Sequence, residues 1–383
     1  MSNWAQRRRR LYSVAFFFSL RVVLLAAQVM LLAPIIRSKP SGTYRTHGAL
    51  SCFAVLVLLL LCGAAPFLLR IIAATYERVG VQFDNIFVLI AMTSQVCDIS
   101  IVLISLLSQI WQRRRLCEFL NHLEDTVQRV RTIHGRHFIK SRVLLLLWLQ
   151  LGLTLYDVLM QLVFLSKLAF KIDPWQFLVN LLSLYLQQCR ATLQLLVMGY
   201  LLLLIACYAQ LAECLEHFPE DSSGEQLHYE DLVSLHDALY ELTLQLKRVF
   251  QLPLFLLVTG EFINVLANLY AQLYYYVITK AWWFAFVFYC AKISIELYLL
   301  IHVVHFCCEL HRKVTHLFLN RDLVLEEPSA HWRFELTHSD VLWPQPIRFD
   351  ILGMFELNNE FWLFLASYSV NFIVIIVQFG FFN

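Results

Sequence analysis

The most informative polar residues of the chain lie in its last apolar segment, residues 361–382. Ser367, Asn371 and Gln378 are spaced four and seven residues apart, so they share one face of a helix, with Ile375 between the last two. A narrow polar stripe on an otherwise apolar helix either bonds a neighbouring helix or lines a water-filled path in an oligomer. The stripe carries no charge, so it predicts weak ion selectivity at most.

Ionisable residues inside other apolar segments form the second group of candidates. There are six of them: Asp98, Asp157, Arg190, Glu261, Lys292 and Glu296. A charge is costly inside a membrane, so such residues either pair with one another or serve a function. Lys292 and Glu296 are four residues apart and can neutralise each other on one helix. Arg190 can pair with Asp98 or Asp157, and the sequence leaves the functional interpretation open.

Aromatic residues gather at the outer ends of the fifth and sixth apolar segments. They are Tyr270, Tyr274, Tyr275, Tyr276, Trp282, Trp283, Phe284, Phe288 and Tyr289. They either form a belt at the membrane interface or line a pocket for a hydrophobic or cationic ligand. Aromatic residues of the third and fourth segments could close the same pocket. For the pocket interpretation, the candidate ligand-binding residues are Tyr156, Trp175, Tyr274, Trp283 and Tyr289.

Enzymatic chemistry is not indicated by the sequence. We find no metal-ligand spacing, no nucleophile elbow and no paired catalytic carboxylates beside the apolar segments. His302 and His305 have no partner ligands at their depth and are interpreted as packing residues. We therefore predict no catalytic residue, no metal site and no cofactor. The basic residues cluster beside apolar segments, which does not favour nucleic-acid binding.

The composition places these residues in a membrane. Hydrophobic residues make up 59% of the 383 residues and charged residues 15%, with a mean hydropathy of +0.63, against about 45–50% and about 25% in soluble domains. A bilayer core needs about 20 apolar residues per helix. Seven segments have that length: residues 49–69, 84–109, 142–167, 175–206, 252–279, 282–307 and 361–382. The predicted fold class is an all-α membrane protein with seven transmembrane helices.

The basic residues predict how these spans are oriented. Most Lys and Arg residues fall in segments 1–48, 110–142, 207–251 and 308–360. Because Lys and Arg concentrate on the cytoplasmic side, the N-terminus is predicted inside and the C-terminus outside. An eighth span starting at Val14 would place the run Arg7–Arg10 outside. We therefore interpret residues 14–36 as an interfacial or re-entrant helix.

The predicted cytosolic segments form a helical bundle. In segment 207–251, five leucines follow alternating spacings of three and four: Leu232, Leu235, Leu239, Leu242 and Leu246. This seam favours packing into a larger bundle that extensions of spans four to six complete. Segment 308–360 is predicted to add a short helix over residues 334–341. The predicted divisions are the N-terminal segment 1–48, spans one to four in 49–206, the insert 207–251, spans five and six in 252–307, segment 308–360 and the last helix in 361–383.

A spaced motif closes the chain. Asn371-Phe372 is followed by five apolar residues and then by Gln378-Phe379, and the stretch Gly353-Met-Phe-Glu-Leu357 precedes it. This order resembles the insect gustatory receptor family, relatives of the insect odorant receptors, whose seventh span ends with Thr-Tyr, five apolar residues and Gln-Phe. Here Asn and Phe stand where the family has Thr and Tyr. The length, the seven spans and the predicted orientation also match that family.

The resemblance implies a ligand-gated, non-selective cation channel that assembles as a homo- or hetero-tetramer. In that family, four seventh spans line the central pore. The predicted cytosolic bundle, with the short helix before the last span, resembles the family's helical anchor domain, which carries most contact between subunits. Carried over, Gln378 and Phe379 would form the gate, and Asn371 and Ile375 would line the pore. A small-molecule tastant would bind in the outer region of helices one to six, in a protein surrounded by membrane lipid. The implied location is the plasma membrane of chemosensory neurons.

The sequence also bears on the class of tastant and on two alternative protein classes. The outer region is more aromatic than polar, which favours a bitter or otherwise aversive tastant over a sugar. A G-protein-coupled receptor is the first alternative, but the sequence lacks an Asp-Arg-Tyr run and an Asn-Pro-x-x-Tyr motif, and its charge bias is opposite. A secondary transporter is the second, although no internal repeat supports it.

Overall fold

The computed structural model describes residues 3–38, 43–78, 85–134, 138–168, 174–217, 226–279, 284–324, 346–351, 353 and 355–380. Its helices are α1 (Asn3–Val29), α2 (Gly48–Arg78), α3 (Asn85–His134), α4 (Ser141–Leu168), α5 (Pro174–Glu216), α6 (Gln226–Thr279), α7 (Phe284–Val324) and α9 (Asn359–Gly380). Two antiparallel hairpins join β1 (Ile35–Arg37) to β2 (Tyr44–Thr46), and β3 (Asp350–Ile351) to β4 (Phe355–Glu356). The predicted helix over 334–341 lies outside the described residues.

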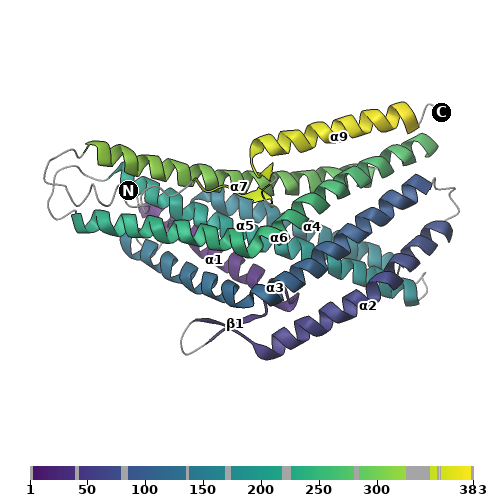
Figure 1. Cartoon of the computed structure of the whole chain (residues 1–383), viewed down its shortest axis with the longest axis horizontal. Helices are drawn as coiled ribbons and strands as arrows, with labels where there is room; N and C mark the ends of the chain where they lie inside the picture. Colours follow the sequence, from purple (N-terminus) through teal and green to yellow (C-terminus); the bar gives the residue numbers. More distant parts are fainter. Residues whose placement is uncertain are drawn as a thin grey trace.

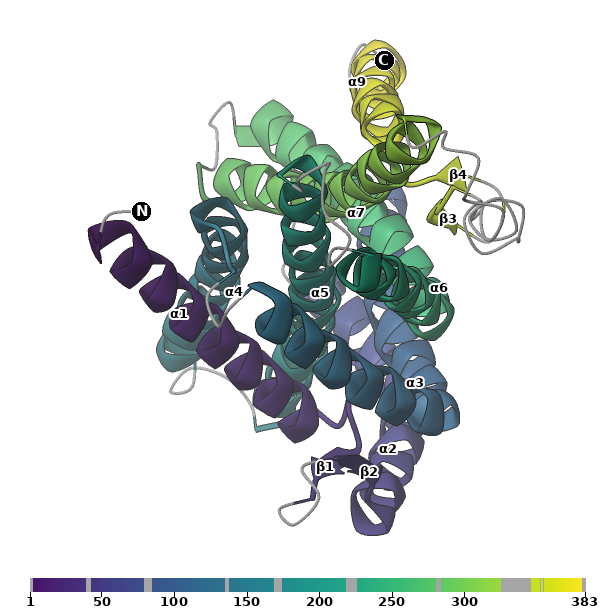
Figure 2. The ribbon, with the colours of Figure 1, turned by 90° about the vertical axis from the view of Figure 1, so that its left-hand side faces the viewer.

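The long helices run side by side along the longest dimension of the molecule (Figure 1). Helix α5 lies in the middle of the bundle, with other long helices around it (Figure 2). It is buried along most of its length, and the side chains of Tyr200, Leu204 and Tyr208 are at most 2% exposed. A helix that is covered on all sides needs apolar residues all round, which is the pattern of this segment.

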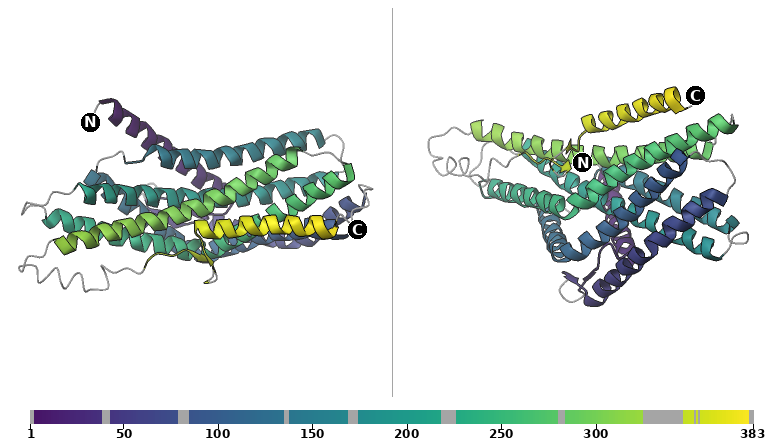
Figure 3. Two further views of the ribbon diagram at one scale, coloured as in Figure 1. Left: turned by 90° about the horizontal axis from the view of Figure 1, so that it is seen from above. Right: turned by 45° about the vertical axis from the view of Figure 1, so that its right-hand side comes forward.

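The predicted all-α membrane class is confirmed. Within the described residues, eight helices are long and apolar enough to cross a membrane, so the chain is a multi-pass membrane protein. Helices α2 to α7 and α9 correspond to the seven predicted spans. The eighth apolar helix is α1, which is inclined to the others and lies in the half of the bundle away from the C-terminal end of α9 (Figure 3). Its interfacial placement stays a prediction.

Four helices are much longer than a membrane crossing requires. Helices α3, α5, α6 and α7 contain 50, 43, 54 and 41 residues, whereas about 20 residues cross the hydrocarbon core. The expected extension of spans four to six is therefore confirmed, and α3 extends as well. Our interpretation of segment 110–142 missed this extension because Arg113–Arg115 interrupt the apolar pattern. Buried Leu116, Phe119 and Leu123 nevertheless continue the helical spacing through it.

The leucine seam of α6 lies inside this bundle. All five leucines, from Leu232 to Leu246, are at most 1% exposed within the single chain. The seam therefore packs within its own subunit, against neighbours that include α3 and α7. This arrangement confirms the interpretation of the seam as bundle packing.

Shortening one seam leucine is expected to destabilise the bundle. Leu242→Ala removes a fully buried side chain, and the remaining cavity should lower the free energy of unfolding by about 2–5 kcal/mol. The measurement is the thermal unfolding midpoint of the purified protein. Leu252→Ala is the matched control on the same helix, because Leu252 is 37% exposed and its truncation leaves a smaller cavity. Equal midpoints for both variants would contradict the seam assignment.

Helix α1 ends earlier than predicted. The sequence interpretation continued a helix to Ile36, but α1 ends at Val29 and the chain enters strand β1 at Ile35. Leu31 adopts a left-handed conformation with φ of 62°, and Pro34 cannot donate the amide that a continuing helix requires. The β1–β2 hairpin then rests on α3, where Tyr44 N donates to Asn121 Oδ1 at 2.7 Å. A strand of three residues is too short to show the alternation of apolar and polar residues from which a strand is predicted.

A second hairpin positions the start of α9. Gly353 occupies its turn with φ of 75°, a conformation that glycine adopts without strain. Lys247 of α6 donates to the Asp350 carboxylate and, at 2.8 Å, to the carbonyl of Arg348. The hydrogen bond from Lys247 lowers the pKa of the Asp350 carboxyl. The segment that leads into α9 is thus tied to the end of the membrane portion of α6.

Loosening this tie is expected to mobilise the segment before α9. Lys247→Met should cost less than about 1 kcal/mol of global stability because the pair is partly exposed, yet it should speed amide exchange in residues 346–357. In the unmodified chain, the lowered pKa of Asp350 sets the pH dependence of the Lys247–Asp350 pair. The pair is intact at pH values above the ordinary pKa of Asp, and it is lost as the pH falls through the lowered pKa. Hydrogen exchange followed by mass spectrometry measures both effects.

The control for this prediction is Arg248→Met. Arg248 is exposed and lies 4.0 Å from Glu241 on the same helix, so this variant removes the same charge without touching the hairpin. Equal exchange in both variants would show that Lys247 does not hold the segment.

Candidate functional site

An ion-pair network joins the helices in the membrane portion of the bundle. Arg190 of α5 contacts Asp98 of α3 at 2.5 Å and Glu261 of α6 at 3.1 Å. Asn264 Nδ2, also on α6, donates to the same Asp98 oxygen at 3.0 Å. All four side chains are buried. Arg190 therefore pairs with Asp98, one of its two predicted partners, and Glu261 is a second partner that we had not predicted.

A second ion group adds α4 and α7 to this network. Lys292 of α7 contacts Glu296 one turn further along at 2.7 Å, and it also pairs with Asp157 of α4. Gln150 of α4 donates to Glu296 at 3.3 Å, and Gln194 of α5 donates to the Glu296 carbonyl at 3.1 Å. The predicted pairing of Lys292 with Glu296 is confirmed. The two groups connect five helices, α3 to α7.

The network contains more carboxylates than bases. Asp98, Asp157, Glu261 and Glu296 face Arg190 and Lys292, as four acids against two bases. Buried charges need partners because their desolvation is expensive, and Glu261 Oε2 has no hydrogen-bond partner among the described residues. The excess negative charge of the network can therefore be neutralised by protonation of a carboxylate or by binding of a positively charged group.

A close helix contact brings Glu261 to this position. Gly260 lies one residue before it, and a Cβ atom there would come within 2.2 Å of Ile101 Cδ1 on α3. Glycine thus permits α6 to approach α3 closely enough for Glu261 and Asp98 to share Arg190.

Three amide side chains of the network were not predicted from the sequence. They are Gln150 of α4 and Asn264 of α6, which donate to the carboxylates of Glu296 and Asp98, and Gln194 of α5, which donates to the Glu296 backbone carbonyl. The sequence contained a signal for them, because they are amide residues inside apolar segments, and buried amides need hydrogen-bond partners.

The structure describes four of the five candidate ligand-binding residues. Tyr289 is nearest to the ion network, with its ring centre 5.9 Å from Lys292 Nζ. Tyr274 is half-buried and stacks on Tyr270, with 6.2 Å between the ring centres. Tyr156 and Trp175 are 43% and 68% exposed. Trp283 lies outside the described residues, and the ligand-binding role of the set stays a prediction.

The polar stripe of α9 faces away from its own bundle. Leu365 and Ser369 point towards α6 and α7, and Leu365 is buried. Ser367, Asn371 and Gln378 lie on the opposite side of the helix and are exposed in the single chain. Figure 1 shows α9 along the outside of the bundle.

Three of the four pore candidates have described side chains, and all three lie on the outward face of α9. Asn371 and Ile375 share the outward face of α9, and Ile375 is 55% exposed. Gln378 continues this face at the last turn. The backbone of Phe379 is helical, and its side chain lies outside the described part. The outward face thus combines three polar residues with apolar ones, as the spacing indicated.

Comparison with known proteins identifies the family. The family model described as 7tm Chemosensory receptor matches residues 20–383. The provisionally named gustatory receptor 89a of Drosophila melanogaster is 33% identical over 356 residues, which are 92% of this chain and 93% of that receptor. Gustatory receptor 93b of the same species, also provisionally named, is 28% identical over 146 residues, 38% of this chain and 36% of that receptor.

The fold has a counterpart among solved structures. The insect olfactory receptor OR5 from Machilis hrabei in complex with eugenol superposes with a TM-score of 0.67, and a second structure of OR5 with 0.65. Both comparisons cover 96% of this chain and 99% of OR5 at 12% identity, which supports the shared fold alone. On the match over residues 20–383 and the near full-length relative, the chain belongs to the 7tm chemosensory receptor family and is a member of the insect gustatory receptors.

Proposed function

We propose that this chain is a gustatory receptor that acts as a ligand-gated, non-selective cation channel. The observation that carries the proposal is the outward polar stripe of α9, where Ser367, Asn371 and Gln378 are exposed in the single chain. Amide and hydroxyl groups that faced lipid would lose their hydrogen bonds to water. A stripe on the outer side of an outer helix therefore finds partners in other subunits or in a shared water-filled pore.

Assembly into a tetramer accounts for the whole outward face of α9. Four copies of the helix would place Asn371 and Ile375 along a central pore, with Gln378 and Phe379 at its narrowest point. Apolar residues in such a constriction exclude water when the pore is closed, and the amides provide polar contacts when it is open. The absence of charge on the stripe fits a pore that passes cations without strong selection.

The proposed ligand is a bitter or otherwise aversive small molecule that binds in the outer region of helices α2 to α7. Two features support this assignment: the many aromatic residues there and the buried carboxylates of the ion network. One of the OR5 structures is a complex with eugenol, so a receptor of this fold binds a small molecule. The proposed location is the plasma membrane of chemosensory neurons, with the chain in homo- or hetero-tetramers.

The proposal is tested by recording from cells that express this chain without other chemosensory receptors. We expect bitter compounds to evoke a current that reverses near 0 mV when sodium is the main cation on one side of the membrane and potassium on the other. Such a reversal potential shows that the pore does not discriminate between the two cations. The response should persist in excised patches without GTP, because the chain itself would be the conducting pore. A response that disappears without GTP would support a G-protein-coupled receptor, and a current coupled to substrate uptake would support a transporter. Robust activation by sugars alone would overturn the ligand class.

A further inference from the structure

A second polar site lies apart from α9 and from the ion network. It is a pocket of about 130 Å³ between α1, the extended half of α3, α5 and the β1–β2 hairpin. It lies at the end of the bundle that the basic residues assign to the cytosol. None of the pore or ligand candidates lines it.

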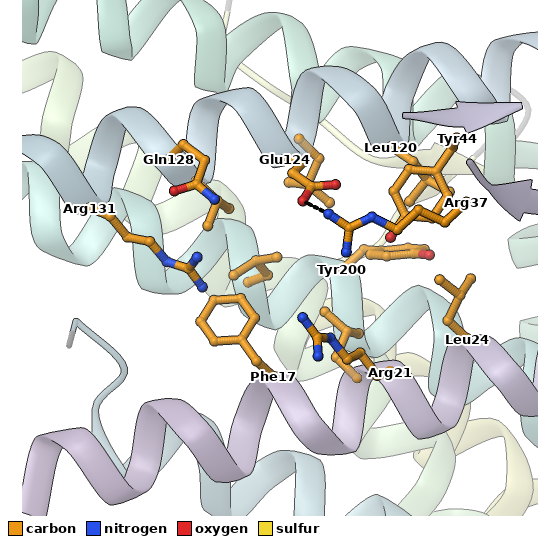
Figure 4. Close-up of a pocket in the computed structure, with 14 residues that line it drawn as sticks. Phe17, Arg21, Leu24, Arg37, Tyr44, Leu120, Glu124, Gln128, Arg131 and Tyr200 are labelled. Atoms are coloured by element: carbon orange, nitrogen blue, oxygen red, sulfur yellow. Dashed lines mark hydrogen bonds and ion pairs between the residues drawn. The ribbon is translucent and has the colours of Figure 1, made fainter. Parts of the chain in front are cut away.

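Three arginines from three different elements enter this pocket. Figure 4 shows the guanidinium groups of Arg21 from α1, Arg37 from β1 and Arg131 from α3 around a common space. Glu124 is the one acidic residue among those that line the pocket, and it pairs with Arg37. Three Arg residues against one Glu leave a formal charge of +2 on the lining. Such an excess of guanidinium groups favours an anion.

Aromatic rings hold two of the guanidinium groups in place. The Arg131 guanidinium lies 4.4 Å from the ring centre of Phe17, and the Arg37 guanidinium lies 5.9 Å from that of Tyr44. Planar guanidinium groups stack on aromatic faces, and this stacking restricts their orientation. The pocket thus presents ordered donors before any ligand enters.

A buried hydroxyl in the same pocket is the second, independent indication of a ligand. Tyr200 lines the pocket beside Arg37 (Figure 4). Its side chain is 2% exposed, and its hydroxyl has no hydrogen-bond partner among the described residues. A buried hydroxyl without a partner is costly, so its presence needs an explanation. A bound anion with oxygen acceptors would supply the missing partner.

The groove beside the pocket combines polar side chains with apolar side chains of α1. A groove of about 720 Å³ adjoins the pocket and shares four of its lining residues: Phe17, Arg21, Gln128 and Arg131. Its other lining residues are Ser13, Val14, Phe18 and Thr132. Val14 and Phe18 belong to an exposed apolar face of α1 that also contains Leu11, Val22, Leu25 and Val29. A ligand that fills both spaces needs an anionic group joined to a hydrocarbon chain.

We infer that the pocket binds the phosphate group of an anionic membrane lipid, with its acyl chains along the outer face of α1. Guanidinium groups recognise phosphate through paired, charge-assisted hydrogen bonds, and basic pockets between helices on the cytoplasmic side suit lipid head groups. The lipid would join α1 to α3 and α5 at the base of the bundle. The exposed apolar face of α1 beside the pocket favours a lipid over a free phosphate compound.

The test measures binding to the purified full-length receptor in detergent by thermophoresis. The probes are a dioctanoyl phosphatidylinositol bisphosphate, the free inositol trisphosphate and a dioctanoyl phosphatidylcholine. We expect the bisphosphate lipid to bind most tightly. Replacing two arginines in Arg21→Gln/Arg131→Gln should raise its Kd at least about tenfold. Tyr200→Phe should raise the Kd by a smaller factor, because it removes one donor and keeps the ring.

The control is Arg129→Gln, which removes an arginine charge from an exposed position on α3 that does not line the pocket. Arg131→Lys keeps the positive charge, so it is a conservative variant for comparison. Size-exclusion profiles of all variants separate loss of binding from loss of folding. Equal affinity in the double variant and the control would overturn the site. Equal binding of inositol trisphosphate and the lipid would overturn the lipid assignment.

Discussion

Replacing Arg190 with methionine is expected to have the largest effect on the stability of the receptor. The substitution would leave the carboxylates of Asp98 and Glu261 buried without their base, since Arg190 contacts them at 2.5 and 3.1 Å. Removing one partner of a buried pair typically costs about 3–5 kcal/mol, because the remaining charge stays desolvated. We expect little folded receptor at the cell surface and a lower thermal unfolding midpoint of any purified protein.

The control for this prediction is Arg312→Met. Arg312 pairs with Glu309 at 2.6 Å, but both side chains are about half exposed, so its removal should cost less than about 1 kcal/mol. Glu261→Gln adds a second comparison, because it removes one of the surplus carboxylates while keeping the shape of the side chain. If Arg190→Met and Arg312→Met unfold at the same temperature, the network does not stabilise the bundle.

Shortening the proposed gate is expected to have the largest effect on conduction. Gln378→Ala/Phe379→Ala would widen the narrowest point of the proposed pore and weaken its closed state. A change of about 1.4 kcal/mol in the closed–open equilibrium corresponds to a tenfold change in open probability when the channel is mostly closed. We therefore expect the current without ligand to rise by about tenfold, as measured in whole-cell recordings normalised to surface receptor.

Val370→Ala is the control for the gate variant. Val370 is 59% exposed on the same helix, and it lies about a quarter turn away from Asn371 around the helix axis. It should leave the basal current unchanged. A gate variant that reaches the surface normally and shows neither leak nor altered conductance would assign Gln378 and Phe379 to helix packing.

Features that depend on local periodicity could be predicted from the sequence. The shared face of Asn371 and Gln378 follows from the geometry of one helix, and so does the buried seam of α6. In both cases the spacing is a property of a single segment. The seven long spans could also be predicted, because the length of an apolar run needs no knowledge of its neighbours.

The choice of partners in the ion network could not be predicted in full. The cost of a buried charge indicates that Arg190 must be paired, but only the packing of α3 and α6 decides that Asp98 and Glu261 are its partners. Asp157 instead pairs with Lys292.

The arginine pocket was missed for the same reason. Arg21, Arg37 and Arg131 are far apart in the sequence, so no local spacing connects them. The hairpin that brings Arg37 to α3 has strands of only three residues, which is too short for a recognisable alternation.

The most direct test of the central claim, that α9 lines a pore, is the accessibility of single cysteines on this helix. Asn371→Cys lies on the outward polar face, whereas Ser369→Cys lies on the face towards the bundle, where Ser369 donates to the Leu365 carbonyl at 2.9 Å. A positively charged thiol reagent would be applied to open channels of each variant and of the unmodified chain. We predict rapid block of the current in Asn371→Cys alone. Equal insensitivity of Asn371→Cys and Ser369→Cys would contradict a pore lined by α9.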